Sequence, residues 1–156
     1  MKIRLLAVGS RMDDWVRDGF LSYVERLPRE LRLELVEVPL ARRSPGTPAA
    51  AARQKEGEKL LKLLRPGEYV VALDEGGVAW SSTELAGRLR GWLQRQPELA
   101  LVIGGPDGLT DDVRQRAQAV WSLSALTFPH GLVRILVAEQ LYRAWTILQG
   151  HPYHKA

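Results

Sequence analysis

The stretch LVIGGPDGL, residues 101–109, places an apolar run directly before two glycines, a proline, an acid and a third glycine. The apolar run is typical of a buried strand, and the residues after it are typical of a tight turn. Because this turn has almost no side chains, another group can approach its main chain closely. We therefore take the end of this strand as the first candidate binding site, with a simple turn before a helix as the alternative.

Apolar segments alternate with amphipathic ones along the whole chain. We predict strands at 3–8, 31–38, 68–74, 98–105 and 120–128, and helices at 13–27, 49–64, 81–95, 109–119 and 132–148. This alternation is the signature of an α/β fold with a mainly parallel sheet flanked by helices. We find no internal repeat, no low-complexity segment and no second domain, so we predict a single domain over residues 1–156.

The composition excludes several classes of protein. Hydrophobic residues make up 46% of the 156 residues, which is enough for a packed core and too many for a disordered chain. The absence of cysteine excludes disulfides, thiolate chemistry and zinc–cysteine sites. No apolar run approaches the ~18 residues needed to span a membrane, and the opening resembles a strand more than a signal peptide. We therefore expect a cytoplasmic protein without a membrane partner.

The chain is basic, with a net charge of +4. Arginine outnumbers lysine, which indicates either a phosphate-rich partner or a genome that favours arginine codons. The basic residues concentrate in one segment, at Arg42, Arg43, Arg53, Lys55, Lys59, Lys62 and Arg65. This segment is either a footprint for an RNA backbone or an ordinary solvated helix face.

Three predicted strands end in loops of similar composition, at 74–77, 104–108 and 127–131. In open parallel sheets, ligands bind beyond the carboxyl ends of the strands. These loops offer main-chain donors and acceptors between apolar walls, which suits a flat heterocycle such as adenine. Neither the G-x-G-x-x-G fingerprint nor the G-x-x-x-x-G-K-[ST] phosphate loop is present, which disfavours both of those nucleotide-binding classes.

Three long motifs carry a resemblance to a known family. LVIGGPDGL (101–109), WSLSALTFPHGLVRILVAEQLYRAW (121–145) and HPYHK (151–155) resemble, in order and spacing, the bacterial ribosomal RNA large-subunit methyltransferase H family. Residues 2–28 and KEGE at 55–58 are similar too, so the resemblance covers the whole chain. It implies a SPOUT-type fold with a C-terminal trefoil knot and a homodimer. It also implies S-adenosylmethionine-dependent methylation of N3 of a pseudouridine in large-subunit (23S) ribosomal RNA, on assembled ribosomes.

The resemblance further implies which residues form the site. The cofactor pocket would consist of Leu73, Gly105, Leu123, Ser124, Ala125, Leu126, Thr127, Phe128 and Pro129. We add Gly104 because it adjoins Gly105. His130 and Lys155 would contact the substrate, and Arg143, Tyr153 and His154 would be catalytic. At position 155 we expect arginine in relatives, and lysine keeps the charge but loses the bidentate fork.

The chemistry of this reaction suggests roles for Arg143 and for residues 151–156, which we call the tail. N3 of a uracil-type ring is a poor nucleophile until its proton leaves, so a base, or a cation that stabilises the anion, should help. His154 is the candidate base, with Tyr153 as a stacking or orienting partner and Arg143 as a contact to RNA phosphate or the anionic ring. Alternatively, Arg143 is a surface arginine paired with Glu139, and the tail is merely solvated. His151 and His154 have no acid or cysteine beside them, so we predict no metal site.

Two other functions remain open from the sequence. The chain could be a regulatory module that binds an adenine ligand without chemistry, or a non-catalytic ribosome-associated protein. A domain of this size has little room for an RNA-binding module beside a cofactor pocket. We therefore expect a dimer to supply that surface, with the tail of one subunit reaching toward the pocket of the other.

Overall fold

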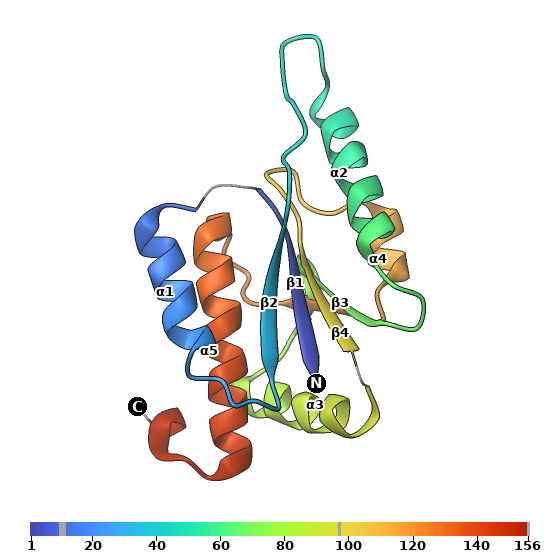
Figure 1. The fold of residues 1–156 in the computed structure, drawn as a ribbon. Helices are drawn as coiled ribbons and strands as arrows, with labels where there is room; N and C mark the ends of the chain where they lie inside the picture. Colours follow the sequence, from blue (N-terminus) through green and yellow to red (C-terminus); the bar gives the residue numbers. More distant parts are fainter. Residues whose placement is uncertain (10–11, 97, 156) are drawn as a thin grey trace.

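A parallel sheet of five strands forms the centre of the computed structural model, which describes residues 1–9, 12–96 and 98–155 (Figure 1). The strands are β1 (Lys2–Val8), β2 (Arg32–Val38), β3 (Tyr69–Ala79), β4 (Glu98–Ile103) and β5 (Ala119–Ser122). Their order is β2-β1-β4-β3-β5, and each neighbouring pair is parallel. The predicted α/β fold with a parallel sheet is confirmed, while the trefoil knot stays a prediction.

Helices cover both faces of this sheet in the described part of the chain. They are α1 (Asp14–Val24), α2 (Ala49–Leu63), α3 (Ser82–Arg95), α4 (Asp111–Arg116), α5 (His130–Gln149) and the 3-10 helix η1 (Pro152–Lys155). α1, α3 and α5 lie on one face, and α2 and α4 lie on the other (Figure 1). None of these helices combines the length and the apolar composition that crossing a membrane requires.

The strands bury side chains on both of their faces, as expected for a parallel sheet between two layers of helices. Leu5 and Val71 belong to the hydrophobic cluster on the side of α1, α3 and α5. Their chain neighbours Leu6 and Val70 belong to the cluster on the side of α2 and α4. The sheet therefore has a hydrophobic core on each face.

Capping residues occupy several of the helix ends. Ser81 forms a capping box with Glu84, because the Ser81 Oγ accepts from the Glu84 N–H and the Glu84 carboxylate accepts from the Ser81 N–H. Thr110 caps α4, and Gly150 ends α5 with a φ of 68°. Asp13 occupies the N-cap position of α1, but its side chain makes no capping hydrogen bond.

The prediction that β3 ends before the glycine pair was wrong. The strand continues to Ala79, with a shift in its register to β5 between Leu73 and Val78. Gly77 allows the two strands to approach, because a Cβ at this position would lie 2.6 Å from the Val120 carbonyl oxygen. The glycine pair therefore marks an irregular strand rather than a turn.

The prediction that the fifth strand runs to residue 128 was also wrong. β5 ends at Ser122, whose Oγ donates to the carbonyl of Ser124 at 3.0 Å. The Leu126 N–H in turn donates to the Ser124 Oγ at 3.0 Å. Such local hydrogen bonds from serine to the main chain compete with strand pairing. Residues 123–129 consequently leave the sheet as a loop at its carboxyl edge.

Candidate active site

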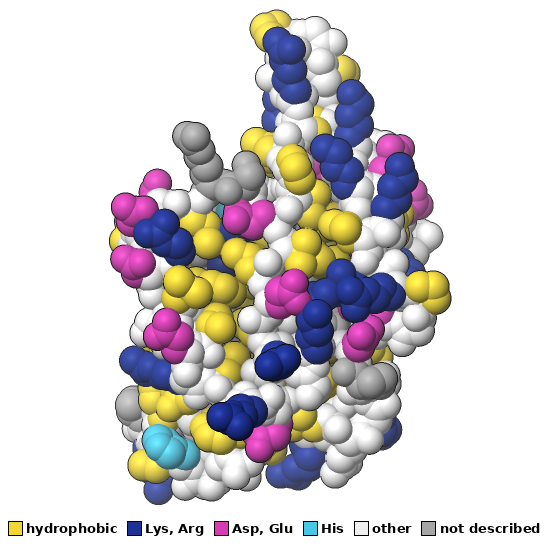
Figure 2. All heavy atoms as spheres, in the orientation of Figure 1, with side chains coloured by type: hydrophobic (Ala, Val, Ile, Leu, Met, Phe, Trp, Pro, Cys, Tyr) yellow, Lys and Arg dark blue, Asp and Glu magenta, His cyan; other side chains and the backbone are white. Residues whose placement is uncertain are grey.

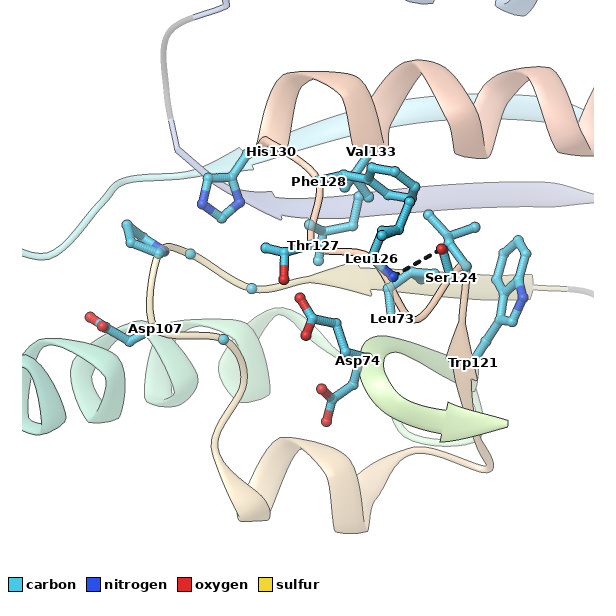
Figure 3. Close-up of a pocket in the computed structure, with 17 residues that line it drawn as sticks. Leu73, Asp74, Asp107, Trp121, Ser124, Leu126, Thr127, Phe128, His130 and Val133 are labelled. Atoms are coloured by element: carbon cyan, nitrogen blue, oxygen red, sulfur yellow. Dashed lines mark hydrogen bonds between the residues drawn. The ribbon is translucent and has the colours of Figure 1, made fainter. Parts of the chain in front are cut away.

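A cavity of about 410 Å³ opens beside residues 73–75 of β3 and beyond the carboxyl ends of β4 and β5, so the three segments predicted to meet do so (Figure 3). Its volume is within the range of sites that bind small ligands. The predicted cofactor residues that line it are Leu73, Gly104, Gly105, Leu123, Ser124, Leu126, Thr127 and Phe128. Ala125 and Pro129, predicted for the same pocket, belong to its 123–129 loop but do not line the cavity.

The cavity differs in character from one end to the other. Trp121 lies at one end and His130 at the other, with Leu73 and Thr127 between them (Figure 3). The Trp121 ring stacks on Trp80, with ring centroids 5.2 Å apart and the planes 14° from parallel. One end therefore presents a rigid apolar wall, and the other presents a titratable side chain.

Main-chain groups of the 123–129 loop are available to a ligand. Among the described residues, the N–H groups of Ala125, Thr127 and Phe128 find no acceptor, whereas that of Leu126 donates to Ser124. Unpaired main-chain donors are costly unless water or a ligand satisfies them. The loop is therefore suited to bind a heterocycle or carboxylate through its backbone.

The glycines of the loop after β4 have an intramolecular reason to lack side chains. A Cβ on Gly104 would lie 2.6 Å from the carbonyl carbon of Gly108, and one on Gly105 would lie 2.9 Å from Glu56 Oε1 and 3.0 Å from Val8 Cγ1. We predicted these glycines for close approach of a ligand. The structure adds that the turn itself could not close with larger residues.

The buried carboxylate of Glu56 lies beneath this loop. We did not predict Glu56 as a residue of the site. Glu56 is 1% exposed, and its Oε2 accepts from the Ala41 N–H at 3.0 Å and from Arg43 Nη1 at 2.7 Å. Arg43 also donates from Nε to Asp107 Oδ2 at 2.9 Å, and Asp107 lines the cavity. Glu56 holds the pKa of the Arg43 guanidinium well above its ordinary value. The pair thus connects the segment before α2 to the loop after β4.

Helix spacing contained a signal for Glu56. It is four residues from both Ala52 and Leu60, which are buried, so the three share one helix face. Leu63 of the same helix, by contrast, is 37% exposed. A carboxylate on a buried helix face requires a partner, and Arg43 is that partner.

His130 begins α5 and is the histidine that lines the cavity. Burial is the main cause that lowers its pKa below the ordinary value, and the positive charge of Arg134 adds to it. A lowered pKa keeps the imidazole neutral near pH 7, so one ring nitrogen can accept a proton or a hydrogen bond.

The other predicted catalytic and substrate residues lie at the far end of α5. Tyr153 in η1 donates its O–H to Glu139 Oε1 at 3.0 Å, and Arg143 Nε donates to the same oxygen at 2.9 Å. The Arg143 guanidinium lies 5.0 Å from the centre of the Tyr153 ring. The alternative pairing of Arg143 with Glu139 is therefore confirmed. Burial raises the pKa of Tyr153, with hydrogen bonds to Tyr23 and Glu139 adding to the effect, so its hydroxyl stays protonated.

The structure does not bring the tail to the cavity of the same chain. Arg143, Tyr153, His154 and Lys155 do not line it. α5 is 20 residues long, which separates its two ends by about 30 Å at 1.5 Å per residue. The tail end of α5 lies at the opposite end of the molecule from the loops that follow the strands (Figure 1). The predicted site thus consists of two groups of residues in one chain.

The model of a family described as predicted SPOUT methyltransferase matches residues 1–154. The chain belongs to the SPOUT methyltransferase family. It is 54% identical over 156 residues to the ribosomal RNA large subunit methyltransferase H of Alkalilimnicola ehrlichii, which covers 100% of both chains. It is 50% identical over 155 residues to the protein of the same name from Hahella chejuensis, covering 99% of each.

Solved structures of methyltransferases share the fold of this SPOUT family member. A probable methylase family protein from Haemophilus influenzae aligns with a TM-score of 0.59 at 13% identity, over 97% of this chain and 69% of that one. A probable methyltransferase from Bordetella pertussis aligns with a TM-score of 0.57 at 20% identity, over 91% and 95%. At these identities the likeness concerns the fold alone.

Proposed function

We propose that this protein uses S-adenosylmethionine to methylate N3 of a pseudouridine in large-subunit (23S) ribosomal RNA, on assembled ribosomes in the cytoplasm. Membership of the SPOUT methyltransferase family supports the reaction class, and the name of its full-length relatives supports the RNA substrate. The observation that carries the proposal is the cavity of about 410 Å³ beside β3 and beyond the carboxyl ends of β4 and β5.

The residues of this cavity fit the proposed cofactor. Free main-chain donors at Ala125, Thr127 and Phe128 suit an adenine ring or a carboxylate, and Leu73 and Trp121 provide an apolar wall. When bound, S-adenosylmethionine would supply an electrophilic methyl group. Asp74 and Asp107 lie on the rim, where carboxylates can bind ribose hydroxyls or an ammonium group. The protein's own task is then to position the RNA base and to manage the N3 proton.

We propose that the tail takes part from a second copy of the chain. His154, Tyr153 and Arg143 as catalytic residues and Lys155 as an RNA contact all need such a copy, because none of them lines the cofactor cavity of its own chain. Hydrophobic side chains gather over α1 and α5 on the face drawn in Figure 2. The exposed apolar residues of these two helices are Trp15, Leu21 and Leu132. An exposed apolar surface on these helices supports a homodimer.

The RNA backbone has a suitable surface in the basic segment. Residues 39–48 and the start of α2 project from the body of the protein and carry several Lys and Arg side chains (Figure 2). The exposed basic residues of this segment include Arg42, Lys55, Lys59 and Lys62. Arg43 instead forms ion pairs with Glu56 and Asp107. We also propose that the chain is a single domain over residues 1–156, because both hydrophobic clusters use the same sheet.

The direct test is mass mapping of ribosomal RNA. Purified protein is incubated with S-adenosylmethionine and large ribosomal subunits from a bacterial strain that lacks this modification. The expected product is one added methyl group on a pseudouridine. Cofactor binding without any methylated nucleotide would favour an adenine-binding module, and absence of cofactor binding would leave a non-catalytic ribosome-associated protein.

A further inference from the structure

A second cavity, of about 230 Å³, adjoins the cofactor cavity. Three side chains contribute apolar walls: Val8 at the carboxyl end of β1, Val16 in the first turn of α1, and Leu40 just after β2. Pro106 and His130 line both cavities, so the two spaces meet at these side chains. The volume is below the usual range for drug-sized ligands and suits a single ring better than a cofactor.

Arg134 supplies a buried cation to this second cavity and does not line the first. The residue is 2% exposed, and it donates from Nη2 to the Gly9 carbonyl at 2.8 Å and from Nη1 to Glu37 Oε2 at 3.3 Å. These bonds use two of the five N–H donors of a guanidinium. The remaining donors favour a ligand that carries carbonyl oxygens or develops negative charge.

Resting on the proposed function, we propose that the second cavity receives the target uracil-type ring. Arg134 donates an N–H to a ring carbonyl oxygen, and a His130 ring nitrogen accepts the N3–H. The N3–H bond then breaks, the proton passes to that imidazole nitrogen, and the electron pair stays on the ring. Arg134 stabilises the negative charge that spreads to the carbonyl oxygen. This assigns proton acceptance to His130 of the same chain instead of His154 of the tail.

The surroundings of His130 agree with this role. Burial, Arg134 and Arg43 lower its pKa, while Glu56 and the Gly104 carbonyl act in the opposite direction. The net direction is downward, so the imidazole is neutral near pH 7 and has a lone pair available for N3–H. Arg134 therefore both favours the accepting form of His130 and compensates the charge left on the ring.

The arrangement also distinguishes between pyrimidines. A uracil-type ring presents carbonyl oxygen, N–H and carbonyl oxygen along one edge, which matches an arginine donor beside a histidine acceptor. A cytosine-type ring lacks the N3–H and carries an amino group in place of one carbonyl. Buried polar groups left without partners reject such an analogue strongly. Access to the cavity requires the base to leave its stack, as enzymes that modify bases commonly require.

The test separates the second cavity from the cofactor cavity. Leu40 is 48% exposed and lines only the second cavity, so Leu40→Trp fills that space without opening the core. We expect kcat/KM on large ribosomal subunits to fall about 10- to 100-fold. The dissociation constant of S-adenosylmethionine, measured by calorimetry, should stay within about twofold of wild type. Leu93→Trp, on an exposed leucine of α3 that lines neither cavity, is the matched control.

Each outcome decides the proposal. If the wild-type protein is active and the Leu40→Trp variant is equally active, the second-cavity proposal is wrong and the proposed function stands. Loss of cofactor affinity in Leu40→Trp overturns it too, because the space would then belong to the cofactor site. A wild-type protein that methylates nothing overturns the proposed function itself. Arg134→Lys keeps the charge but loses the planar fork, and we expect it to lower kcat/KM about tenfold or more with cofactor affinity preserved.

Discussion

The two ends of α5 differ in how they are built, although the sequence predicts one site from both. The end at His130 borders cavities formed by main chain, glycines and apolar side chains from all five strands or the loops after them. The end at Tyr153 carries a closed cluster in which Glu139 accepts hydrogen bonds from Tyr153 and Arg143. The first end has room for ligands, whereas the second pairs Glu139 with Tyr153 and Arg143 and leaves the buried His154 Nδ1 without a partner among the described residues. Residues that the sequence predicts as one site therefore lie apart in one chain, and we propose that a second copy brings them together.

The largest expected effect is at the cavity end. Thr127→Trp places a bulky ring in the cofactor cavity from an exposed loop position, so we expect S-adenosylmethionine affinity to fall about 1,000-fold. Calorimetry measures the affinity. Leu93→Trp is the control, since Leu93 is exposed on α3 and lines neither cavity. Equal affinities in the two variants would exclude this cavity as the cofactor site.

Removal of the Glu56 carboxylate should destabilise the loop on which the cavity depends. Glu56→Ala leaves Arg43 without its buried partner, and such a loss costs about 3 kcal/mol of unfolding free energy. Urea denaturation measures this cost, with Glu58→Ala on the exposed face of α2 as the control. If both variants unfold at the same urea concentration, the Arg43–Glu56 pair does not hold the loop.

Truncation after Gly150 tests the tail end. Removing residues 151–156 should lower kcat about 100-fold, because the tail is proposed to contact the substrate of a second copy. Affinity for S-adenosylmethionine should remain, since none of the described tail residues, 151–155, lines the cofactor cavity. A truncated protein with the wild-type rate would remove the tail from the mechanism.

The pH dependence of kcat/KM distinguishes the histidines at the two ends. The acceptor is the neutral imidazole, so activity falls as the pH drops through the pKa of the base. Because the pKa of His130 is lowered, its acid limb lies below the ordinary histidine value of 6.5. His130→Asn should abolish this limb and reduce the rate. A limb that persists in His130→Asn but disappears on truncation would assign the proton to His154.

The smallest effect is expected inside the tail cluster. Tyr153→Phe removes the hydrogen bond to Glu139 and keeps the ring, so it should cost about 1 kcal/mol of stability. Thermal unfolding measures this cost, and cofactor affinity should not change. A marked loss of cofactor affinity would mean that the two ends communicate within one chain.

The sequence predicted the alternating elements and the strand ends that form the cavity, because apolar periodicity and turn residues are local signals. It did not predict that β3 continues past Leu73 or that β5 stops at Ser122, since these depend on pairing between strands and on serine hydrogen bonds. We did not predict Glu56 for the site, because a carboxylate is stable on a buried helix face only with a cationic partner, and the sequence does not show that Arg43 lies beside it. The separation of the tail from the cavity follows from the direction of α5, which motif spacing does not encode.

Co-expression of two inactive variants tests the account most directly. Thr127→Trp lacks a working cofactor cavity, and the protein truncated after Gly150 lacks the tail. If the two ends of α5 meet across a dimer, the mixed dimer contains one intact cavity and one intact tail, and methylation of large ribosomal subunits should return. Methylation that stays absent in the mixed dimer, while each variant is folded, would contradict a site shared between two copies.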